Sequence, residues 1–585
     1  MRKYAILILA AATLGASLNG AFADTLVWTN TAGGFFLDPG NWKANKVPGG
    51  LDTTEVYSNG TYTVTLDGDA NVTNLTAKSG VIGLTFDLNG RTLTSASNGI
   101  VAVATVAGSA IDWTVKSSAP GGVFNLFQLD VFKTLATTRG SISILGANTT
   151  VNVTNGSTGD NMVMNYASNT IFTVSDGAHL NVSQTLIFGI GLLPAIARNQ
   201  TPTINPYTTM TVSGTGTTYS NLLKSIIIGK AGTNMPSVVV SNSAVLYTQG
   251  INIGSGGDTW YSYSPKANGK LVVTGTNSYC DGASLSMSAL AGEYGTTGST
   301  AGGRVVVEKG GVLNLRGGAT LSTGYNQYYP SSGLNAGAET NLNAYGEVIV
   351  RNPGSLFKTA GNVKLTELAQ GAVYVLDGAT WSSGASATFT LAGGVNGTVQ
   401  TNSWPLTNSY AYGLCVISNA NSSASFNKVN FSDSVGYSDL IVADNARLSV
   451  TNGTGCSMTI TNRCRLTVSD AFAETQTLNV RSNATIRIGL GARAHTSAYI
   501  TATAAVTLDP SAKLDINILA NATINSGDTI KLLAYTGTRT GTFKDLPEGA
   551  ALFVNGRRFR IYYGTGSNSA ITVRYLPMGS LIRVL

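Results

Sequence analysis

Residues 305–321, Val-Val-Val-Glu-Lys-Gly-Gly-Val-Leu-Asn-Leu-Arg-Gly-Gly-Ala-Thr-Leu, contain the unit that is repeated through the middle of this 585-residue chain. The unit has an alternating strand that ends in Val, a turn-like tetrad, an apolar residue six positions after the Val, and a second short strand. The first strands of seven copies are Phe172–Val174, Met210–Val212, Val238–Val240, Leu271–Val273, Val305–Val307, Val348–Val350 and Val373–Val375. In six copies the apolar residue is Leu180, Leu246, Tyr279, Leu313, Leu356 or Trp381. The second strands are Leu186–Phe188, Ile226–Ile228, Ile251–Ile253, Leu285–Met287, Ala319–Leu321, Val363–Leu365 and Ala387–Phe389.

The copies follow one another at uneven distances. From Val350 to Val375 there are 25 residues, whereas from Val307 to Val350 there are 43. One copy is too small to bury its own apolar face, so it must stack on its neighbours, as the units of a solenoid do. The shortest distance corresponds to about one coil, and the longer ones carry insertions. We therefore predict an all-β protein folded as a single elongated parallel β-helix.

Composition agrees with an ordered all-β chain. Only 11% of the residues are charged and 69 are Gly, and the mean hydropathy of +0.13 is too high for a disordered polar tract. The net charge of +7 is spread thinly along the sequence. Because the basic residues are scattered and no nucleic-acid reader motif is present, we expect no nucleic-acid partner.

The first 23 residues have the pattern of an export signal. Arg2 and Lys3 precede an apolar core from Ile6 to Leu14, and Ala21-Phe22-Ala23 fits the small-x-small rule for cleavage. The apolar core is too short to span a bilayer, and no other stretch reaches about 18 apolar residues. We expect an exported protein without a transmembrane span in the mature chain.

The remaining chain is expected to form four segments: an N-terminal cap over 24–60, β-helix repeats with lateral insertions over 61–526, a closing segment over 527–577 and a short tail over 578–585. The cap is predicted from Trp28, Phe35, Phe36 and Trp42, because a solenoid must shield its first coil from edge pairing. A lectin-like aromatic site is the alternative interpretation of these rings.

Two parts of the sequence resemble bacterial exported proteins with autotransporter-associated strand repeats. One is Trp28…Asn41-Trp42…Pro48 followed by Thr85-Phe-Asp-Leu-Asn-Gly-Arg-Thr-Leu93. The other, similar to the end of autotransporter passenger domains, comprises Gly527–Leu533, Gly541–Phe543, Leu546–Gly549, Ile561–Gly564 and Ile571–Val573. The resemblance implies a right-handed β-helix, outside or on the surface of a Gram-negative-type bacterium. It departs from autotransporters in one respect, since the alternating strands of a translocator barrel are not found before Leu585.

Catalysis is not expected. β-Helices of the pectin lyase-like fold include polysaccharide lyases and hydrolases, so the fold alone does not exclude an enzyme. Glycoside hydrolysis requires two carboxylates about 5 to 10 Å apart, and the Asp-Asp and His-Gly motifs of pectinases are missing. The two histidines, His179 and His495, have no hydrolase context around them. We predict no catalytic residue, no metal site and no cofactor.

Aromatic residues in the insertions are the candidate binding residues, because exposed rings can stack on sugars. They are Trp260, Tyr261, Tyr263, Tyr325, Tyr328, Tyr329, Trp404, Tyr410 and Tyr412. The alternative is that they cover apolar corners of the solenoid. Cys456 and Cys464, eight residues apart, are a candidate disulfide in an exported chain, and no Cys or His spacing suggests zinc.

Together these patterns predict a non-enzymatic protein that serves as a structural stalk or adhesin, with surface glycans or other envelope proteins as partners. The alternative, from a different class, is a protein that binds or degrades polysaccharide in a lateral groove.

Overall fold

The computed structural model describes residues 23–56, 58–78, 81–103, 110–131, 139–154, 162–164, 170–188, 208–229, 235–254, 266–288, 300–322, 343–366, 370–392, 411–432, 436–566 and 569–577. The chain divides into two compact units. Unit 1 comprises Met1–Thr173 and Gly177–Gln184, and unit 2 comprises Val174–Asp176 and Thr185–Leu585. The described residues form β-strands and two short 3-10 helices, η1 (Pro39–Asn41) and η3 (Ala492–His495). No helix in the described ranges is both long and apolar enough to cross a bilayer.

Unit 1 contains two groups of parallel strands. The first group is β1 (Thr25–Val27), β3 (Thr53–Val56), β5 (Ala70–Lys78), β7 (Thr92–Val103), β9 (Gly122–Leu126), β10 (Asp130–Val131), β12 (Thr149–Val153), β13 (Met162–Met164) and β15 (His179–Val182). The second is β2 (Gly34–Phe35), β4 (Gly60–Thr65), β6 (Val81–Asp87), β8 (Ala110–Lys116) and β11 (Arg139–Leu145). Strand β14 (Thr170–Ser175) contains residues of both units. Each strand pairs with strands of the coils before and after it, which is the hydrogen-bonding pattern of a parallel β-helix.

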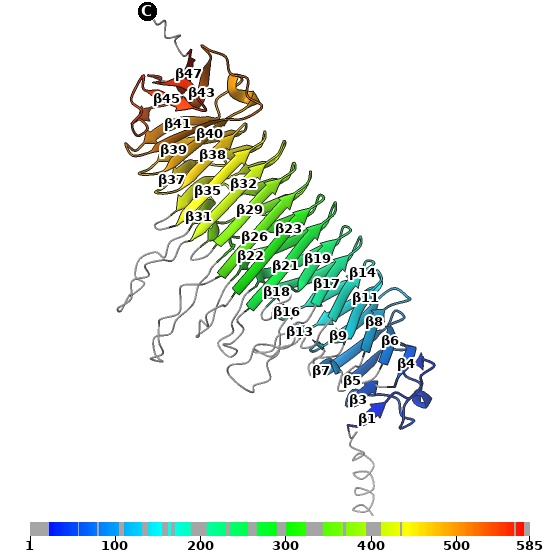
Figure 1. The fold of residues 1–585 in the computed structure, drawn as a ribbon. Helices are drawn as coiled ribbons and strands as arrows, with labels where there is room; N and C mark the ends of the chain where they lie inside the picture. Colours follow the sequence, from blue (N-terminus) through cyan, green and yellow to red (C-terminus); the bar gives the residue numbers. More distant parts are fainter. Residues whose placement is uncertain are drawn as a thin grey trace, which may run out of the picture. The chain divides into compact units, whose positions relative to one another are not determined.

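Unit 2 repeats this arrangement (Figure 1). Its sheet 1 is β16 (Leu186–Phe188), β18 (Thr218–Ile228), β20 (Val245–Ile253), β22 (Tyr279–Met287), β24 (Val312–Leu315), β25 (Ala319–Thr320), β27 (Leu356–Thr359), β28 (Val363–Thr366), β30 (Thr380–Ser383), β31 (Thr388–Ala392), β33 (Ser423–Ser425), β34 (Lys428–Ser432), β36 (Arg447–Val450), β37 (Ser457–Ile460), β39 (Phe472–Val480), β41 (Ile500–Leu508), β43 (Thr529–Tyr535) and β44 (Arg539–Thr540). Its sheet 2 is β17 (Thr208–Ser213), β19 (Ser237–Ser241), β21 (Lys266–Thr274), β23 (Thr300–Glu308), β26 (Asn343–Arg351), β29 (Gln370–Leu376), β32 (Tyr412–Ser418), β35 (Tyr437–Ala443), β38 (Arg465–Ser469), β40 (Thr485–Leu490) and β42 (Lys513–Ile518). The all-β parallel β-helix predicted from the repeats is confirmed.

The repeated Val residues form one buried column on the inner face of sheet 2. Six of the seven predicted Val residues occupy it, in the order Val212, Val240, Val273, Val307, Val350 and Val375. All six are completely buried. β-Branched side chains suit this position because they are stiff and pack well on a pleated surface. The column continues through Ile417, Val442, Val468, Ile488 and Ile516 in coils beyond the predicted seven.

The apolar residue six positions after the Val does not point inward in two of the copies, those of Tyr279 and Leu356. Residues six positions after the Val point inward at Leu246, Leu313 and Trp381, but the same inward column contains Cys280 and Phe357, which are seven positions after it. Tyr279 and Leu356 are consequently only half-buried.

Turn chemistry explains this one-residue difference. In the shorter turns two consecutive residues have positive φ, as at Lys309 and Gly310 or Asp377 and Gly378. In the longer ones the two such residues are separated by one, as at Gly275 and Asn277 or Asn352 and Gly354. Gly, Asn and Asp adopt positive φ at low cost, so the order of these residues sets the turn length.

A column of glycines in sheet 2 marks the line along which strand ends of sheet 1 meet it. The glycines are in register in successive coils at Gly269, Gly303, Gly346, Gly371 and Gly413. A Cβ atom built on Gly346 would lie 1.6 Å from the carbonyl oxygen of Leu321 and one on Gly413 would lie 2.2 Å from that of Leu391. The backbone of one strand end therefore touches these residues, and no side chain fits there.

The two ends of the chain are built differently from the coils. Near the start, Trp28, Phe36 and Trp42 are buried and pack edge to face, with ring centroids 5.2 Å apart in each contact with Trp42. Strands β1 and β3 in this region already pair in the parallel manner, so segment 24–60 belongs to the stack as well as carrying the aromatic cluster.

At the other end the pairing becomes antiparallel. Strand β43 pairs in parallel with β41, but its other side pairs antiparallel with β47 (Ser569–Leu576). Strands β46 (Arg557–Tyr563) and β45 (Ala551–Val554) continue the antiparallel order. An antiparallel segment ends the parallel ladder without a free template for a further coil.

Candidate functional site

The outer face of sheet 2 carries four tyrosines on four successive strands, which we call the tyrosine ladder: Tyr345 on β26, Tyr374 on β29, Tyr412 on β32 and Tyr437 on β35. They occupy positions that alternate with the buried columns, so their rings stand on the opposite side of the sheet. Tyr345, Tyr412 and Tyr437 belong to one register column, in which Gln370 takes the place on β29, and Tyr374 lies four residues further along that strand. Tyr345 is 40% exposed, and the other three are half-buried.

A groove of about 840 Å³ continues from the end of the ladder across β35, β38, β40 and β42. Its charged lining residues are Arg463, Arg465, Arg487, Lys513, Asp439 and Asp515. Four cations against two carboxylates give the groove an excess of positive charge.

Ion pairs between neighbouring coils hold most of this charge. Arg465 contacts Asp439 at 2.9 Å, and Arg487 contacts Asp515 at 2.6 Å. In both pairs the two residues are register partners on adjacent strands. Partly exposed ion pairs of this kind contribute little to stability, so their effect is mainly to fix the side chains in place.

Arg463 is positioned differently because an aromatic ring holds it. Its guanidinium lies 5.7 Å from the centre of the Tyr437 ring, and its Nη1 donates a hydrogen bond of 3.0 Å to the Tyr437 hydroxyl. The side chain is exposed, and its guanidinium forms no ion pair with a carboxylate of the described residues. Arg463 and Lys513 therefore present positive charge toward the groove.

The hydroxyl of Tyr412 donates a hydrogen bond of 3.1 Å to Asp439 Oδ2. Burial raises the pKa of Tyr412 to about 12, and the negative charge of Asp439 adds to the effect while Arg465 opposes it. Tyr412 is thus a neutral hydrogen-bond donor across the ordinary pH range, and it contributes a ring and a fixed hydroxyl rather than a proton-transfer group.

This arrangement is suited to binding rather than to acid–base chemistry. Each carboxylate of the groove is engaged by an arginine, which leaves neither free to donate a proton to a leaving group as glycoside hydrolysis requires. Within the described ranges, no three His, Cys, Asp or Glu side chains converge in a way that could hold a metal ion.

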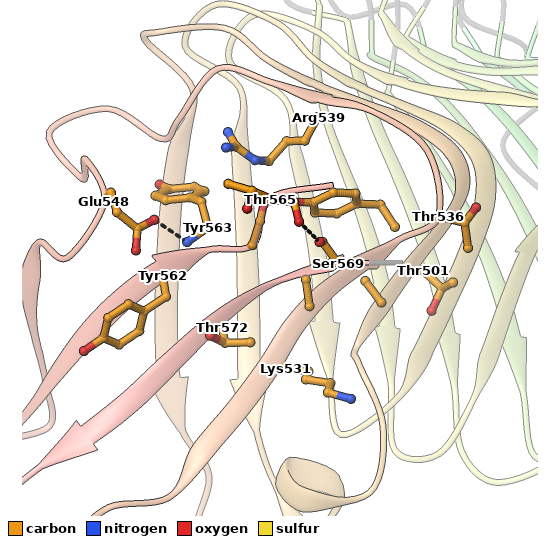
Figure 2. A pocket seen from close by; sticks show the side chains of 14 residues that line it. Thr501, Lys531, Thr536, Arg539, Glu548, Tyr562, Tyr563, Thr565, Ser569 and Thr572 are labelled. Carbon is orange, nitrogen blue, oxygen red and sulfur yellow. Dashed lines mark hydrogen bonds between the residues drawn. The ribbon is translucent and has the colours of Figure 1, made fainter. Parts of the chain in front are cut away.

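A second cavity, of about 950 Å³, lies in the antiparallel C-terminal segment (Figure 2). Its titratable lining includes one carboxylate, Glu548, together with Lys531 and Arg539. Glu548 accepts a hydrogen bond of 2.7 Å from the backbone N–H of Tyr563, and the Arg539 guanidinium lies 4.9 Å from the centre of the Tyr563 ring. A single carboxylate that already caps a backbone N–H does not make a catalytic pair.

Of the predicted glycan-stacking residues, only Tyr412 lies within the described ranges, and it belongs to the ladder and the groove. The others, Trp260, Tyr261, Tyr263, Tyr325, Tyr328, Tyr329, Trp404 and Tyr410, lie outside the described residues. Tyr345, Tyr374 and Tyr437 were not predicted, because only the insertions, and not the repeated strands, were considered as sources of exposed aromatic rings. Their signal is a Tyr on the outward positions of the repeated strand.

The predicted partners Cys456 and Cys464 are not joined. All four cysteines are free, buried thiols. Cys280 and Cys415 occupy inward columns between apolar residues, and burial raises the pKa of both thiols. Cys456 Sγ contacts the Gly453 carbonyl at 3.2 Å, whereas Cys464 Sγ approaches the Gly436 carbonyl at 3.8 Å. The cysteines therefore behave as small core residues.

A comparison with protein-family models finds no match, and neither does a comparison with curated proteins. The resemblance to exported strand-repeat proteins accordingly stays a prediction, and the function must be argued from the molecule itself.

Proposed function

We propose that the protein is an exported, non-enzymatic β-helix that acts as a structural stalk or adhesin at the surface of a Gram-negative-type bacterium or in its surroundings. The observation that carries the proposal is the pairing of charged residues between neighbouring coils in the described ranges. The pairs Arg304–Glu347, Arg351–Glu308, Arg465–Asp439 and Arg487–Asp515 each join register partners of neighbouring coils.

In these pairs each charged group binds the opposite charge on the neighbouring coil. The groups therefore join one coil to the next and do not form a catalytic cleft. The same is true of the polar groups in unit 1, where Asn181 donates to Asn152 and Asn152 donates to Asn125 at 2.9 Å each. The export signal predicted over 1–23 supplies the route out of the cytoplasm. A regular flank built from repeated coils is suited to spacing and display.

The test is surface labelling of intact cells of a Gram-negative host that express residues 1–585. We expect antibody to reach the protein on intact cells or in the medium, and cells that display it to attach differently to surfaces or to other cells. A matched variant without residues 2–23 should be detected only after lysis. The proposal fails if the full chain is also detected only after lysis and keeps its first 23 residues.

The tyrosine ladder favours a second candidate function, the binding of an extended acidic polysaccharide. Stacked strands are about 4.8 Å apart, a spacing comparable with the length of one sugar residue in an extended chain. Tyr412 and Tyr437, which are register partners on adjacent coils, can therefore meet successive sugars, while Arg463 and Lys513 provide cations for acidic groups. The alternative of degradation is less well supported because the carboxylates of the groove are paired with arginines.

Titration of residues 24–585 with acidic and neutral polysaccharides tests this candidate. We expect affinity for the acidic ones that weakens with salt, and no shortening of the chains. Tyr437→Ala should lower the affinity roughly tenfold, as loss of an aromatic anchor does. Tyr247→Ala is the matched control, because Tyr247 is 37% exposed but lies on sheet 1. Equal losses in the two variants would exclude the ladder as the binding surface.

A further inference from the structure

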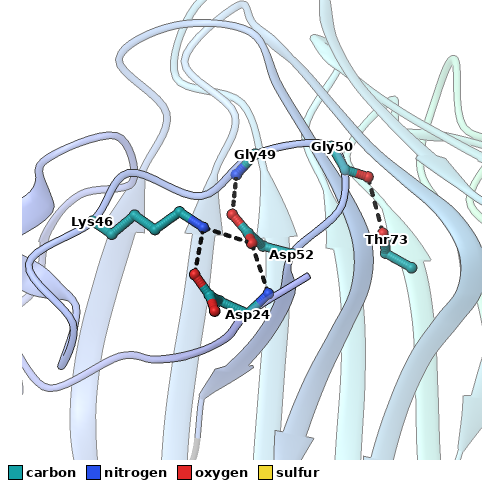
Figure 3. Close-up of polar contacts among 6 residues, drawn as sticks. All are labelled: Asp24, Lys46, Gly49, Gly50, Asp52 and Thr73. Atoms are coloured by element: carbon teal, nitrogen blue, oxygen red, sulfur yellow. Dashed lines mark hydrogen bonds and ion pairs between the residues drawn. The ribbon is translucent and has the colours of Figure 1, made fainter. Parts of the chain in front are cut away.

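Asp52 is a carboxylate that unit 1 buries close to the start of the described chain. It is 3% exposed. Its Oδ1 accepts hydrogen bonds from the backbone nitrogen of Asp24 at 3.0 Å and from Lys46 Nζ at 2.9 Å, and its Oδ2 accepts one from the backbone nitrogen of Gly49 at 2.8 Å (Figure 3). Lys46 and Gly49 belong to the segment just before Asp52, whereas Asp24 comes from the start of the described chain.

Asp24 is fixed through three groups. Besides its nitrogen, its carbonyl oxygen accepts a hydrogen bond from the backbone nitrogen of Thr53 at 2.8 Å, and its side chain contacts Lys46 Nζ at 2.7 Å. Ala23 and Asp24 are themselves exposed. This held residue is the one that directly follows Ala21-Phe22-Ala23, the predicted cleavage site.

The charges of the cluster do not balance in the uncleaved chain. Asp24 and Asp52 bring two negative charges, and Lys46 brings one positive charge. The Lys46 side chain is 42% exposed, whereas that of Asp52 is only 4% exposed. A carboxylate so deeply buried is costly unless opposite charge and hydrogen bonds compensate it. The cluster is one positive charge short, and the nitrogen of Asp24 is the atom at which that charge could appear.

We propose that cleavage of the Ala23–Asp24 bond during export creates an α-ammonium group at Asp24 that docks on the Asp52 carboxylate and locks the first strand of unit 1. Hydrolysis consumes one water, leaves a carboxylate on Ala23 and an amine on Asp24, and the amine takes up a proton at neutral pH. The cluster then has two positive and two negative charges. The inference rests on the export that the proposed function requires.

The docked ammonium has a definite pH dependence. The charged groups that face Asp52 are Lys46, which disfavours a second cation, and the Asp24 side chain, which favours it. With two carboxylates against one lysine, the pKa of the α-amine is raised above its ordinary value of about 7.7 to 8.0. The stabilisation is complete below that range and is lost as the pH rises through the raised value.

The Asp52 carboxylate already accepts hydrogen bonds that stabilise its ionised form. Burial alone would raise the pKa of Asp52, but the hydrogen bonds from Lys46, from the Asp24 backbone and from the Gly49 backbone together lower it. Asp52 is therefore ionised at every pH above its lowered pKa, and the α-amine is protonated at every pH below its raised pKa, so the two charges coexist over the neutral range.

The experiment compares three forms of the mature chain, each released from a cleavable tag. One begins at Asp24, one has an additional Gly before Asp24, and one begins at Asp24 and carries Asp52→Asn. The rate at which an amine-reactive label modifies the N-terminal amine is measured between about pH 6 and pH 10 by mass spectrometry. We expect the Asp24 form to react roughly tenfold more slowly near neutral pH, which corresponds to a pKa shift of about one unit. The other two forms should react at the ordinary rate.

Equal rates in the Asp24 form and the Gly-extended form would overturn the inference. The extended form keeps Asp52 and Lys46, so it decides the matter even if Asp52→Asn disturbs folding. The near-ultraviolet circular dichroism of the buried Trp28 and Trp42 cluster reports that disturbance. N-terminal sequencing of the exported protein checks the cleavage separately: a start other than Asp24 would refute docking in the cell. Failure of export would instead contradict the proposed function, because the tag-released protein does not depend on it.

Discussion

At the scale of single residues, the groove of unit 2 shows how neighbours tune one side chain. Tyr412 is half-buried, donates to Asp439 and has its pKa raised to about 12. Its unfolded pKa is about 10, so the folded state favours the neutral phenol. The associated stabilisation is present below about pH 10 and is lost as the pH rises toward the folded value.

We therefore expect the difference between the alkaline absorbance titrations of the native protein and of Tyr412→Phe to be a single tyrosine transition near pH 12. In Asp439→Asn the same transition should move to lower pH but remain above about 10, because burial is the larger cause of the shift. A difference transition at the ordinary value of about 10 would contradict the geometry of the groove. If the pKa of Tyr412 returned to its ordinary value in Asp439→Asn, the charge of Asp439, and not burial, would be the main cause of the shift.

At the scale of the strand, glycine is required where two backbones meet. Gly346 on β26 has no room for a Cβ atom, because the Leu321 carbonyl oxygen would lie 1.6 Å from it. Gly346→Ala must push two strand ends apart, and overpacking of this kind costs about 1 to 3 kcal/mol or more. We expect faster hydrogen exchange in β26 and in its partners β23 and β29.

Gly50→Ala is the control for this prediction. Its backbone has nothing within 4 Å of an added Cβ atom, so exchange and thermal unfolding should change little. If Gly346→Ala is as harmless as the control, the line where the two sheets meet is less tightly packed than the contacts indicate.

At the scale of the strand, the sequence predicted the buried Val column but not the position of the next inward residue after each turn. The stacking of Val212 through Val375 follows from alternation alone, because a buried face must repeat every second residue. The inward position of Phe357 rather than Leu356 depends on a turn one residue longer, and that turn is encoded by the order of Asn352 and Gly354. Reading the two turn patterns separately would have corrected the register.

The site was harder to predict for a physical reason. The tyrosine ladder exists only when four strands are brought into register, and its members are 25 or more residues apart in the sequence, as Tyr412 and Tyr437 are. Nothing local distinguishes an outward Tyr that joins a ladder from one that stands alone. In four of the seven copies a Gly precedes the repeated strand by two residues, as Gly346 precedes Val348; this pattern was equally visible, but it has meaning only where the two sheets meet.

At the scale of each unit, a stack of coils is stabilised by contacts between neighbours, so an unprotected end is its weakest point. Unit 2 ends with β43 covered by β47, which is followed by β46 and β45 in antiparallel order. The turn between β45 and β46 also reaches the last strand of sheet 2. There Asn555 Nδ2 donates to Asn517 Oδ1 and to the Ile518 carbonyl oxygen, at 3.4 Å each. One short segment thus covers the ends of both sheets.

Removal of residues 527–585 should therefore expose the edges of β41 and β42 and cause self-association. Unpaired parallel edges with apolar neighbours are templates for another chain, so we expect the molar mass measured by light scattering to rise at least about twofold at micromolar concentration. Removal of residues 578–585 alone is the matched control and should leave the mass unchanged, since β43 to β47 remain complete. A monomeric chain after the longer truncation would mean that the parallel coils protect their own end, and that the antiparallel strands serve another purpose than closing the stack.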